Sequence, residues 1–375
     1  MVYHLVLAFC FFAAWLVERY AMNTAGLWTI GEKKEKSKAF EKKLYLFVAL
    51  YMVALCGFRA YGGMTHVGID TYGYYTSYIN KIRWNLSDIF QEDVSDKGYV
   101  LLEWCLSNLG VSFWVVLLLS AVVYVGAMAI YIYRYSQNRW MSLFIFVAMG
   151  LYTFAFSAIR QSIAMGICMG AYMLSQKVSG WKGFLGFVVL VWLASTIHAS
   201  AIVFLPVYFL GKLPYRNTTI ILMLGIAAIT MLFKNQFANL IVQLAAETSD
   251  KYESYEMVEN AGAGMLLYLF VLMTIVLRLL VSGGMAEAGK TDNSAYFLLF
   301  MLILFPAVQS GGAMMRIYYY YYMFLIVYLP NMLESIEDRK TKQLAYVMLS
   351  FFLIYFYITM DRATLQLVPY QFFWQ

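Results

Sequence analysis

The stretch SFWVVLLLSAVVYVGAMAIYIY, residues 112–133, contains no charged side chain. A helix needs about 20 consecutive apolar residues to cross the hydrocarbon core of a bilayer, and this stretch has that length. Cations follow it closely, at Arg134 and Arg139, as they do where a spanning helix leaves the membrane on its cytoplasmic side. The stretch therefore predicts a transmembrane helix, and other apolar runs along the chain have the same character.

Composition extends this prediction to the whole chain. Of 375 residues, 62% are hydrophobic and 13% are charged, and the mean hydropathy is +0.67, whereas soluble domains are about half apolar and about a quarter charged. We expect an all-α, polytopic integral membrane protein that forms a single transmembrane domain over residues 1–375. The apolar runs predict about 12 transmembrane helices, at residues 3–23, 44–60, 112–133, 141–159, 161–176, 183–197, 199–211, 217–233, 263–281, 294–312, 317–333 and 344–360.

Two parts of this assignment depend on further arguments. Residues 1–17 lack a basic start and a small-residue cleavage site, so we interpret them as part of the first span and not as a signal peptide. Only His198 separates residues 183–197 from residues 199–211. A pair of half-helices that meet near the outer surface is therefore an alternative to two full spans there.

Lysine and arginine residues predict the orientation. The stretch 31–43 carries six lysines and is expected in the cytoplasm. Alternation of the spans then places 18 of the 27 lysines and arginines inside and 9 outside, with both termini outside. Residues 61–111 and 234–262 become extracytoplasmic loops, the first with an interfacial or re-entrant helix at 98–110. The formal charge of +6 follows from this topology and does not indicate nucleic-acid binding.

Several function classes lack the sequence features they need. The expected cytoplasmic loops have about 20 residues or fewer, too few for a nucleotide-binding domain. The chain has no Walker glycine loop, no dinucleotide fingerprint and no Asp-any-Asp pair to hold a metal on a nucleotide sugar. Cys10, Cys56, Cys105 and Cys168 show no metal-ligand spacing and are interpreted as packing residues. We therefore expect no metal, nucleotide or other cofactor.

Polar residues at the expected outer ends of the spans supply the candidate catalytic groups. Charges at membrane depth are costly and are usually kept for pairing or function. Guanidinium groups bind phosphate oxygens bidentately without a metal, so Arg160 and Arg316 are candidates for stabilising a pyrophosphate leaving group. His198 or Asp70 is the candidate general base. The structural alternatives are a membrane-interface anchor for each arginine, a structural histidine, and a loop cap for Asp70.

Other residues on the same face are candidates for binding substrate. They are Arg59, Gln161, Tyr72, Tyr319, Tyr320 and Arg362. The five consecutive tyrosines 318–322 are interpreted mainly as an interfacial aromatic belt and packing surface, from which one or two hydroxyls can reach a sugar.

Ordered motifs along most of the chain resemble those of one family. The motifs are Arg59, Gly68-Ile69-Asp70-Thr71-Tyr72, Lys97-Gly98-Tyr99, FSAIRQSIAMGICMGAY (156–172), LASTIHASAIVFLPVYFL (193–210), Arg316 before the tyrosines, and the closing VPYQFFWQ (368–375). In this order they resemble the EpsG family of Wzy-type polysaccharide polymerases, from residue 44 to residue 375. Lys97 departs from the pattern, because the family often has an acidic residue there.

The resemblance implies an enzyme of the bacterial inner membrane with an architecture like that of GT-C polymerases and ligases. Such an enzyme joins undecaprenyl-pyrophosphate-linked oligosaccharide repeat units on the extracytoplasmic face, to give O-antigen, capsule or exopolysaccharide. Donor and acceptor are then both lipid-linked glycans in the bilayer, and a flippase and a chain-length regulator are expected partners. With one base and no covalent nucleophile, inversion at the anomeric carbon is the simpler outcome.

Two other functions fit many of the same features. A flippase or exporter of lipid-linked oligosaccharide would also have many spans and membrane-embedded arginines. Transporters, however, often have paired halves and a midplane site, whereas here no repeat is evident and the polar residues gather at one face. An O-antigen ligase would use the same donor with a different acceptor and nearly the same chemistry.

The cation distribution predicts the result of a topology experiment. Alkaline phosphatase folds only outside the cytoplasm, so a fusion after Gln375 should be active and a fusion near Lys36 inactive. The phosphatase activity of cells that carry each fusion measures the orientation. Activity only in the Lys36 fusion would place the candidate site on the cytoplasmic face.

Overall fold

The fold is all-helical in a computed structural model, as the sequence predicts. The structure describes residues 2–23, 30–63, 65–91, 94–246, 262–281, 293–308, 315–360 and 365–375. Within these ranges it contains α-helices, two 3₁₀ helices and one isolated β-bridge, between Arg59 and Phe372, but no strand.

The helices follow the expected spans closely. They are α1 (Val2–Asn23), α2 (Ile30–Gly57), α3 (Thr71–Asn80), η1 (Lys81–Arg83), α4 (Leu86–Ile89), α5 (Lys97–Asn108), α6 (Phe113–Tyr135), α7 (Arg139–Ala148), α8 (Leu151–Phe154), α9 (Ile159–Lys177), α10 (Gly180–Ile197), η2 (Ala199–Phe204), α11 (Pro206–Leu210), α12 (Asn217–Leu232), α13 (Lys234–Ala246), α14 (Gly262–Val281), α15 (Ser294–Val308), α16 (Met315–Tyr322), α17 (Leu325–Glu334) and α18 (Arg339–Thr359). Each expected span contains helix, and the spans at 141–159, 199–211 and 317–333 are each broken into shorter helices.

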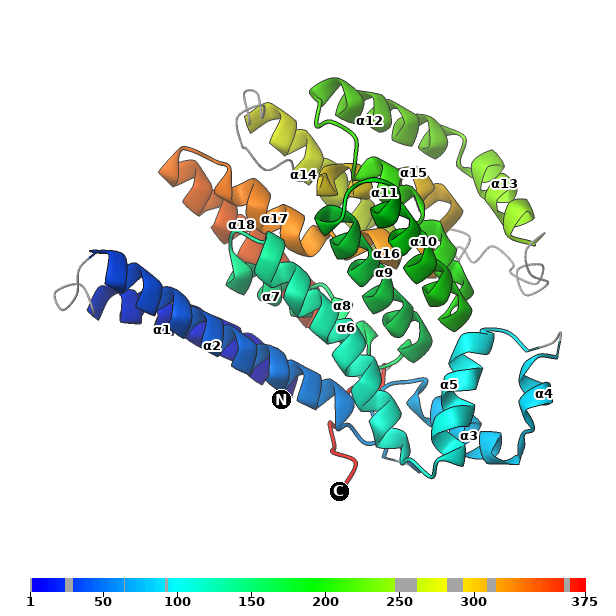
Figure 1. The fold of residues 1–375 in the computed structure, drawn as a ribbon. Helices are drawn as coiled ribbons and strands as arrows, with labels where there is room; N and C mark the ends of the chain where they lie inside the picture. Colours follow the sequence, from blue (N-terminus) through cyan, green and yellow to red (C-terminus); the bar gives the residue numbers. More distant parts are fainter. Residues whose placement is uncertain are drawn as a thin grey trace. The chain divides into compact units, whose positions relative to one another are not determined.

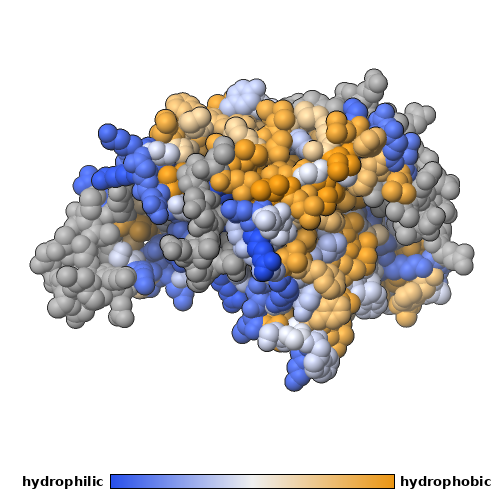
Figure 2. Space-filling model, turned by 90° about the horizontal axis from the view of Figure 1, so that it is seen from above, coloured by the Kyte–Doolittle hydropathy of each residue, from blue (hydrophilic) through white to orange (hydrophobic). Residues whose placement is uncertain are grey.

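Membrane character is clear, but the count of about 12 spans is not confirmed. Among the described residues, three helices are long and apolar enough to cross a bilayer, namely α6, α10 and α18. The pair α12 and α13 would raise this to four if it counts as one span, although it is bent by 92°. Five shorter apolar segments of 10–17 residues accompany them. Figure 2 shows that hydrophobic residues, in orange, cover much of one face of the molecule.

The chain clusters into two compact units, and the single transmembrane domain expected from the sequence stays a prediction. The first unit contains residues 1–170, 193–199 and 348–375, and the second contains residues 171–192 and 200–347. In the second unit, α15 packs against α11, α12, α13, α14, α16 and α17. Aromatic rings fill its centre, where Tyr172 meets Phe297 and Phe324 edge to face. Residues 247–261, within the second expected loop, lie outside the described part of the chain.

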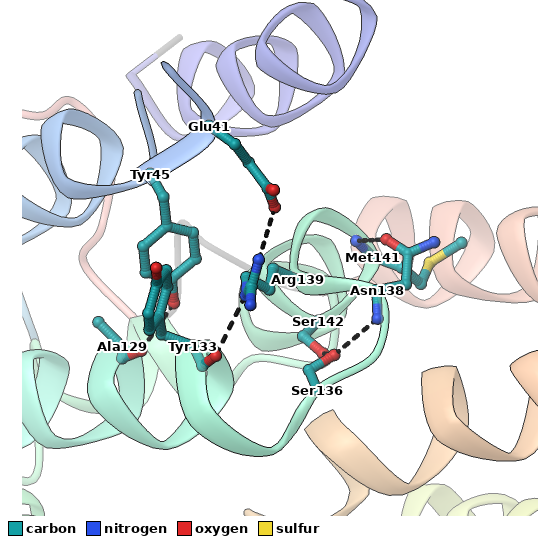
Figure 3. Close-up of polar contacts among 9 residues, drawn as sticks. All are labelled: Glu41, Tyr45, Ala129, Tyr133, Ser136, Asn138, Arg139, Met141 and Ser142. Carbon is teal, nitrogen blue, oxygen red and sulfur yellow. Dashed lines mark hydrogen bonds and ion pairs between the residues drawn. The ribbon is translucent and has the colours of Figure 1, made fainter. Parts of the chain in front are cut away.

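In the first unit, α1 packs along α2, and α2 packs along α6 (Figure 1). A polar cluster ties α2 to the turn between α6 and α7, at the end expected in the cytoplasm (Figure 3). Arg139 there lies 2.8 Å from Glu41 and donates to the carbonyl of Tyr133, while the Tyr45 hydroxyl donates to the carbonyl of Ala129. These contacts give Arg139 a structural role.

At the other end of α2, one fully buried arginine organises the backbone. Arg59 donates to the carbonyls of Cys56, Val67 and Phe156, and it also pairs with Phe372 in the isolated bridge. Backbone carbonyls are strong acceptors that must be paired when buried. Arg59 therefore connects the end of α2, the start of the first outer loop, and the segments before α9 and at the C-terminus.

Residues 61–111 fold into short helices and not into an open loop. The elements α3, η1 and α4 pack around α5, which occupies the position expected for the helix at 98–110. Apolar and aromatic side chains form a shared core with the start of α6 and with α9 and α10: Tyr78, Tyr99, Phe113, Val116, Leu117, Ile159, Ile163 and Ile197. This helical segment is the scaffold of the candidate site.

A glycine allows the chain to pass close to the segment before α9. Gly68 has a φ of +99°, and a Cβ at this position would lie 1.9 Å from the carbonyl oxygen of Phe156. We expect Gly68→Ala to lower the free energy of unfolding by more than about 1 kcal/mol, because both the backbone angle and the contact would be strained. The midpoint of thermal unfolding in detergent measures this change.

Gly73 provides the matched control within α3. No atom lies within 4 Å of a Cβ added there, so Gly73→Ala should unfold at the wild-type midpoint or slightly above it, because alanine favours a helix more than glycine does. Equal midpoints for Gly68→Ala and Gly73→Ala would contradict the close approach.

Candidate active site

The candidate site is built on Asp96, which immediately precedes α5. Its backbone is left-handed, with φ 54° and ψ 46°, a conformation that aspartate tolerates better than most residues. An aspartate at this position usually caps its own helix, but the side chain of Asp96 makes no capping hydrogen bond. The side chain is 9% exposed and contacts residues outside α5.

The carboxylate of Asp96 instead joins groups from α9 and from the end of α10. Oδ2 lies 2.8 Å from Nη1 of Arg160 and 3.6 Å from Nδ1 of His198. Oδ1 accepts a hydrogen bond of 3.1 Å from the backbone N–H of Ala199. One buried carboxylate thus binds a guanidinium directly and has an imidazole nearby, whose Nδ1 has no hydrogen-bond partner among the described residues.

Close packing between α5 and α10 makes this arrangement possible. A Cβ added at Gly98 would lie 2.3 Å from Oγ1 of Thr196, so only glycine fits between the two helices. Thr196 is two residues before His198, and Gly98 is two residues after Asp96. The glycine therefore brings the carboxylate to the end of α10.

Aromatic groups border Arg160 on its other sides. Nε of Arg160 lies 3.4 Å from the hydroxyl of Tyr74, and its guanidinium carbon lies 5.6 Å and 6.0 Å from the ring centroids of Tyr74 and Tyr99. The side chain is 31% exposed, so an anionic ligand can reach it. Guanidinium on an aromatic face with a carboxylate partner is well positioned for phosphate recognition.

The contacts around Asp96 also fix its charge. Burial opposes ionisation, but His198, Arg160 and the N–H of Ala199 together outweigh it, and the pKa of Asp96 lies below its ordinary value. Asp96 is therefore ionised at neutral pH and acts as a fixed negative charge.

A family model matches residues 42–372, which is most of the chain. The chain belongs to the EpsG family. EpsG is a family of Wzy-type polymerases. Membership of this family indicates a polymerase that resembles glycosyltransferases in general, with lipid-linked glycan substrates and a membrane environment. A search of curated proteins finds no match, and a search of solved structures finds none either.

Of the predicted catalytic residues of this EpsG-family chain, the structure brings Arg160 and His198 together through Asp96. Asp70 is exposed at the N-terminus of α3 and makes no side-chain cap there. Arg316 lies at the start of α16 in the second unit, where it is exposed and interacts with Tyr319. The catalytic roles of Asp70 and Arg316 stay predictions.

The predicted substrate-binding residues of the first unit have different surroundings. Tyr72 is 43% exposed and stacks on His66, so it is accessible to a sugar. Arg59 is 0% exposed, and its donors are bound to backbone carbonyls, which favours a structural role. Gln161 is 1% exposed within α9, next to Arg160.

The other predicted substrate-binding residues fall outside the first unit or outside the described chain. Tyr320 is buried in α16, and its hydroxyl lies 3.4 Å from Oγ of Ser200. Tyr319 is half-buried in the same helix. Arg362 lies outside the described residues. Binding of substrate by these side chains stays a prediction.

Asp96 was not among the predicted site residues of this EpsG-family chain. It directly precedes the motif Lys97-Gly98-Tyr99. The Lys97 ammonium lies 3.3 Å from the carbonyl of Phe90. An acidic residue one position before the motif is the signal that could have identified Asp96.

The lowered pKa of Asp96 predicts how its charge contributes to stability. A carboxyl with a lower pKa in the folded state stabilises the fold above its unfolded pKa, and this stabilisation is lost as the pH falls. We expect Asp96→Asn to lower the free energy of unfolding at neutral pH by about 1–3 kcal/mol, because Arg160 loses its charged partner. The difference in unfolding free energy between wild type and Asp96→Asn should become smaller below about pH 4.

Thermal unfolding at neutral pH and at about pH 3.5 measures both effects. Asp70→Asn is the matched control, because Asp70 is exposed and forms no ion pair with the described residues. A stability difference for Asp96→Asn that is equal at both pH values would show that the charge of Asp96 has no stabilising role.

Proposed function

We propose that this chain is a polysaccharide polymerase that joins undecaprenyl-pyrophosphate-linked oligosaccharide repeat units on the extracytoplasmic face of the inner membrane. The observation that supports it most is the single buried carboxylate of Asp96 that holds both Arg160 and His198. A cation for a pyrophosphate and a base for a hydroxyl are the two groups that this transfer requires.

Arg160 is the group proposed to stabilise the leaving group. The donor sugar is bonded through C1 to a lipid pyrophosphate, which becomes more negative as the C1–O bond breaks. A preorganised guanidinium in a site with little water stabilises that charge by about 3–4 kcal/mol. Nη1 and Nε of Arg160 are placed by Asp96 and Tyr74, and Arg316 remains a candidate for a second cation.

His198 is the proposed general base. The Asp96 carboxylate on the Nδ1 side favours the tautomer with its proton on Nδ1. Nε2 is then the nitrogen that can accept a proton. In an Asp–His pair of this kind, the carboxylate orients the ring and stabilises the imidazolium that forms.

The proposed reaction is a single displacement. The hydroxyl oxygen of the acceptor glycan forms a bond to C1 of the donor sugar as the bond from C1 to the pyrophosphate oxygen breaks. The hydroxyl proton passes to Nε2 of His198, and undecaprenyl pyrophosphate leaves with the bonding electrons. One displacement gives inversion at C1, and the roles of Arg160 and His198 need no metal ion.

Substitutions at Arg160 and His198 test this proposal. We expect Arg160→Ala to abolish polymer and Arg160→Lys to recover little of it, because an ammonium does not reproduce two parallel hydrogen bonds. His198→Ala should slow the reaction by about 10²–10⁴-fold. The length distribution of surface polysaccharide in cells, and polymer formation by purified protein with lipid-linked repeat units, measure these effects.

Arg83→Ala is the matched control, because Arg83 is an exposed arginine of the same outer segment, and it should make polymer of normal length. The inactive variants also distinguish a polymerase from an exporter. Single repeat units should still reach the cell surface if only polymerisation is lost. Repeat units trapped on the cytoplasmic face would contradict the proposal and favour transport, and normal polymer in Arg160→Ala would remove Arg160 from the site.

A further inference from the structure

A second carboxylate, Glu103, lies on α5 two helical turns beyond Asp96 and is not used by the proposed reaction. It is 1% exposed. Oε2 accepts a hydrogen bond of 3.1 Å from Oγ of Ser77, whereas Oε1 has no hydrogen-bond partner among the described residues. A buried carboxylate with an unsatisfied oxygen is costly and calls for a physical explanation.

Groups from each neighbouring element surround Glu103. Lys81 of η1 and Arg160 of α9 are the cations that act on it, and Ser77 of α3 and Tyr99 of α5 are its polar neighbours. The pKa of Tyr78 of α3 is raised by burial and also by the negative charge of Glu103. Asp88, the acid of α4, accepts from the backbone N–H of Asn85 at the start of that helix.

A short chain of contacts leads from Glu103 to the candidate site. Tyr99 is near both groups: it is one of the polar neighbours of Glu103, and its ring centroid is 6.0 Å from the guanidinium carbon of Arg160. The same guanidinium is bound to Asp96. Arg160 is therefore influenced by two carboxylates, Asp96 in direct contact and Glu103 without direct contact.

We propose that Glu103 is a positioning residue whose protonation sets the local charge around Arg160, and through it the affinity of the site for the pyrophosphate of the donor. With Glu103 ionised, the charges of Asp96, Glu103, Lys81 and Arg160 sum to zero. With Glu103 protonated, they sum to one positive charge, which favours a pyrophosphate. This inference rests on the proposed function.

The groups around Glu103 allow it to gain or lose its proton near neutral pH. Burial raises the pKa of Glu103 to about 7, against the opposing effects of Ser77, Lys81, Tyr99 and Arg160. Burial likewise lowers the pKa of Lys81, which Glu103 opposes. Glu103 thus loses its proton over a range in which Asp96 stays ionised.

The test compares wild-type protein with Glu103→Gln, which resembles the protonated form in shape and charge. Binding of farnesyl pyrophosphate to each full-length protein in detergent is measured by calorimetry at about pH 5.5 and about pH 8.5. The ratio of the wild-type to the variant dissociation constant should be near one at the lower pH and about three- to tenfold at the higher pH. The ratio cancels the titration of the ligand itself.

Thermal unfolding provides a second readout that requires no activity. A carboxyl with a raised pKa in the folded state makes the fold less stable as the pH rises through that value. The unfolding midpoint of wild type should therefore fall, relative to Glu103→Gln, between about pH 5 and about pH 8. Ser77→Ala removes a hydrogen bond to the ionised form of Glu103. The pH dependence of the dissociation constant and that of the unfolding midpoint should therefore both move to higher pH.

Glu334→Gln is the control for binding, because Glu334 is a partly exposed carboxylate of the second unit bound to Lys342 and Tyr346, and this variant should bind farnesyl pyrophosphate with the affinity and pH dependence of wild type. A dissociation-constant ratio that does not change with pH would overturn the proposal, even if the stability effect were present. A changing ratio in a protein that makes no polymer would support the link to Arg160 and count against the polymerase.

Discussion

The carboxylate of Asp96 is the interaction on which the candidate site depends. It is almost buried, it accepts from a guanidinium and a backbone N–H, and it lies 3.6 Å from an imidazole nitrogen. Removing the carboxylate would leave the partly exposed guanidinium of Arg160 without its charged partner, at the cost of about 1–3 kcal/mol expected for Asp96→Asn. Arg160 and His198 can therefore keep their places only while Asp96 is ionised and α5 stays against α10. The tight fit of Gly98 against Thr196 is the packing condition for this charge arrangement.

Much of the helical architecture could be predicted from the sequence, because a spanning helix requires a long apolar run and little else. Hydropathy does not report breaks inside such a run. At Gly150, between α7 and α8, the chain adopts a φ of +77°, and the flanking residues are as apolar as those of a continuous helix. For the same reason, the apolar runs predict helices reliably and the number of membrane crossings poorly.

The site was predicted only in part, for reasons that differ between residues. Arg160 and His198 stand out as polar residues at the ends of apolar runs. Asp96 lies in a polar stretch, where a cap or a solvated side chain is the ordinary expectation. Its contacts with Arg160 and Ala199 join residues 64 and 103 positions apart, and only tertiary packing brings them together. Asp70, in a similar polar stretch, has an exposed side chain, and nothing local distinguishes the two.

Asp96, directly before α5, and Glu103, within α5, have pKa values shifted in opposite directions by their surroundings. Asp96 has a cation in direct contact and a backbone donor, so its charged form is favoured. Glu103 is buried with one hydroxyl donor and with cations that do not contact it, so desolvation dominates and its neutral form persists to about pH 7. Environments that separate the pKa values of neighbouring acids are typical of sites where each acid has a different role. In the mechanism we propose, the fixed charge of Asp96 orients the reacting groups, and the titratable charge of Glu103 adjusts how strongly the guanidinium of Arg160 attracts an anion.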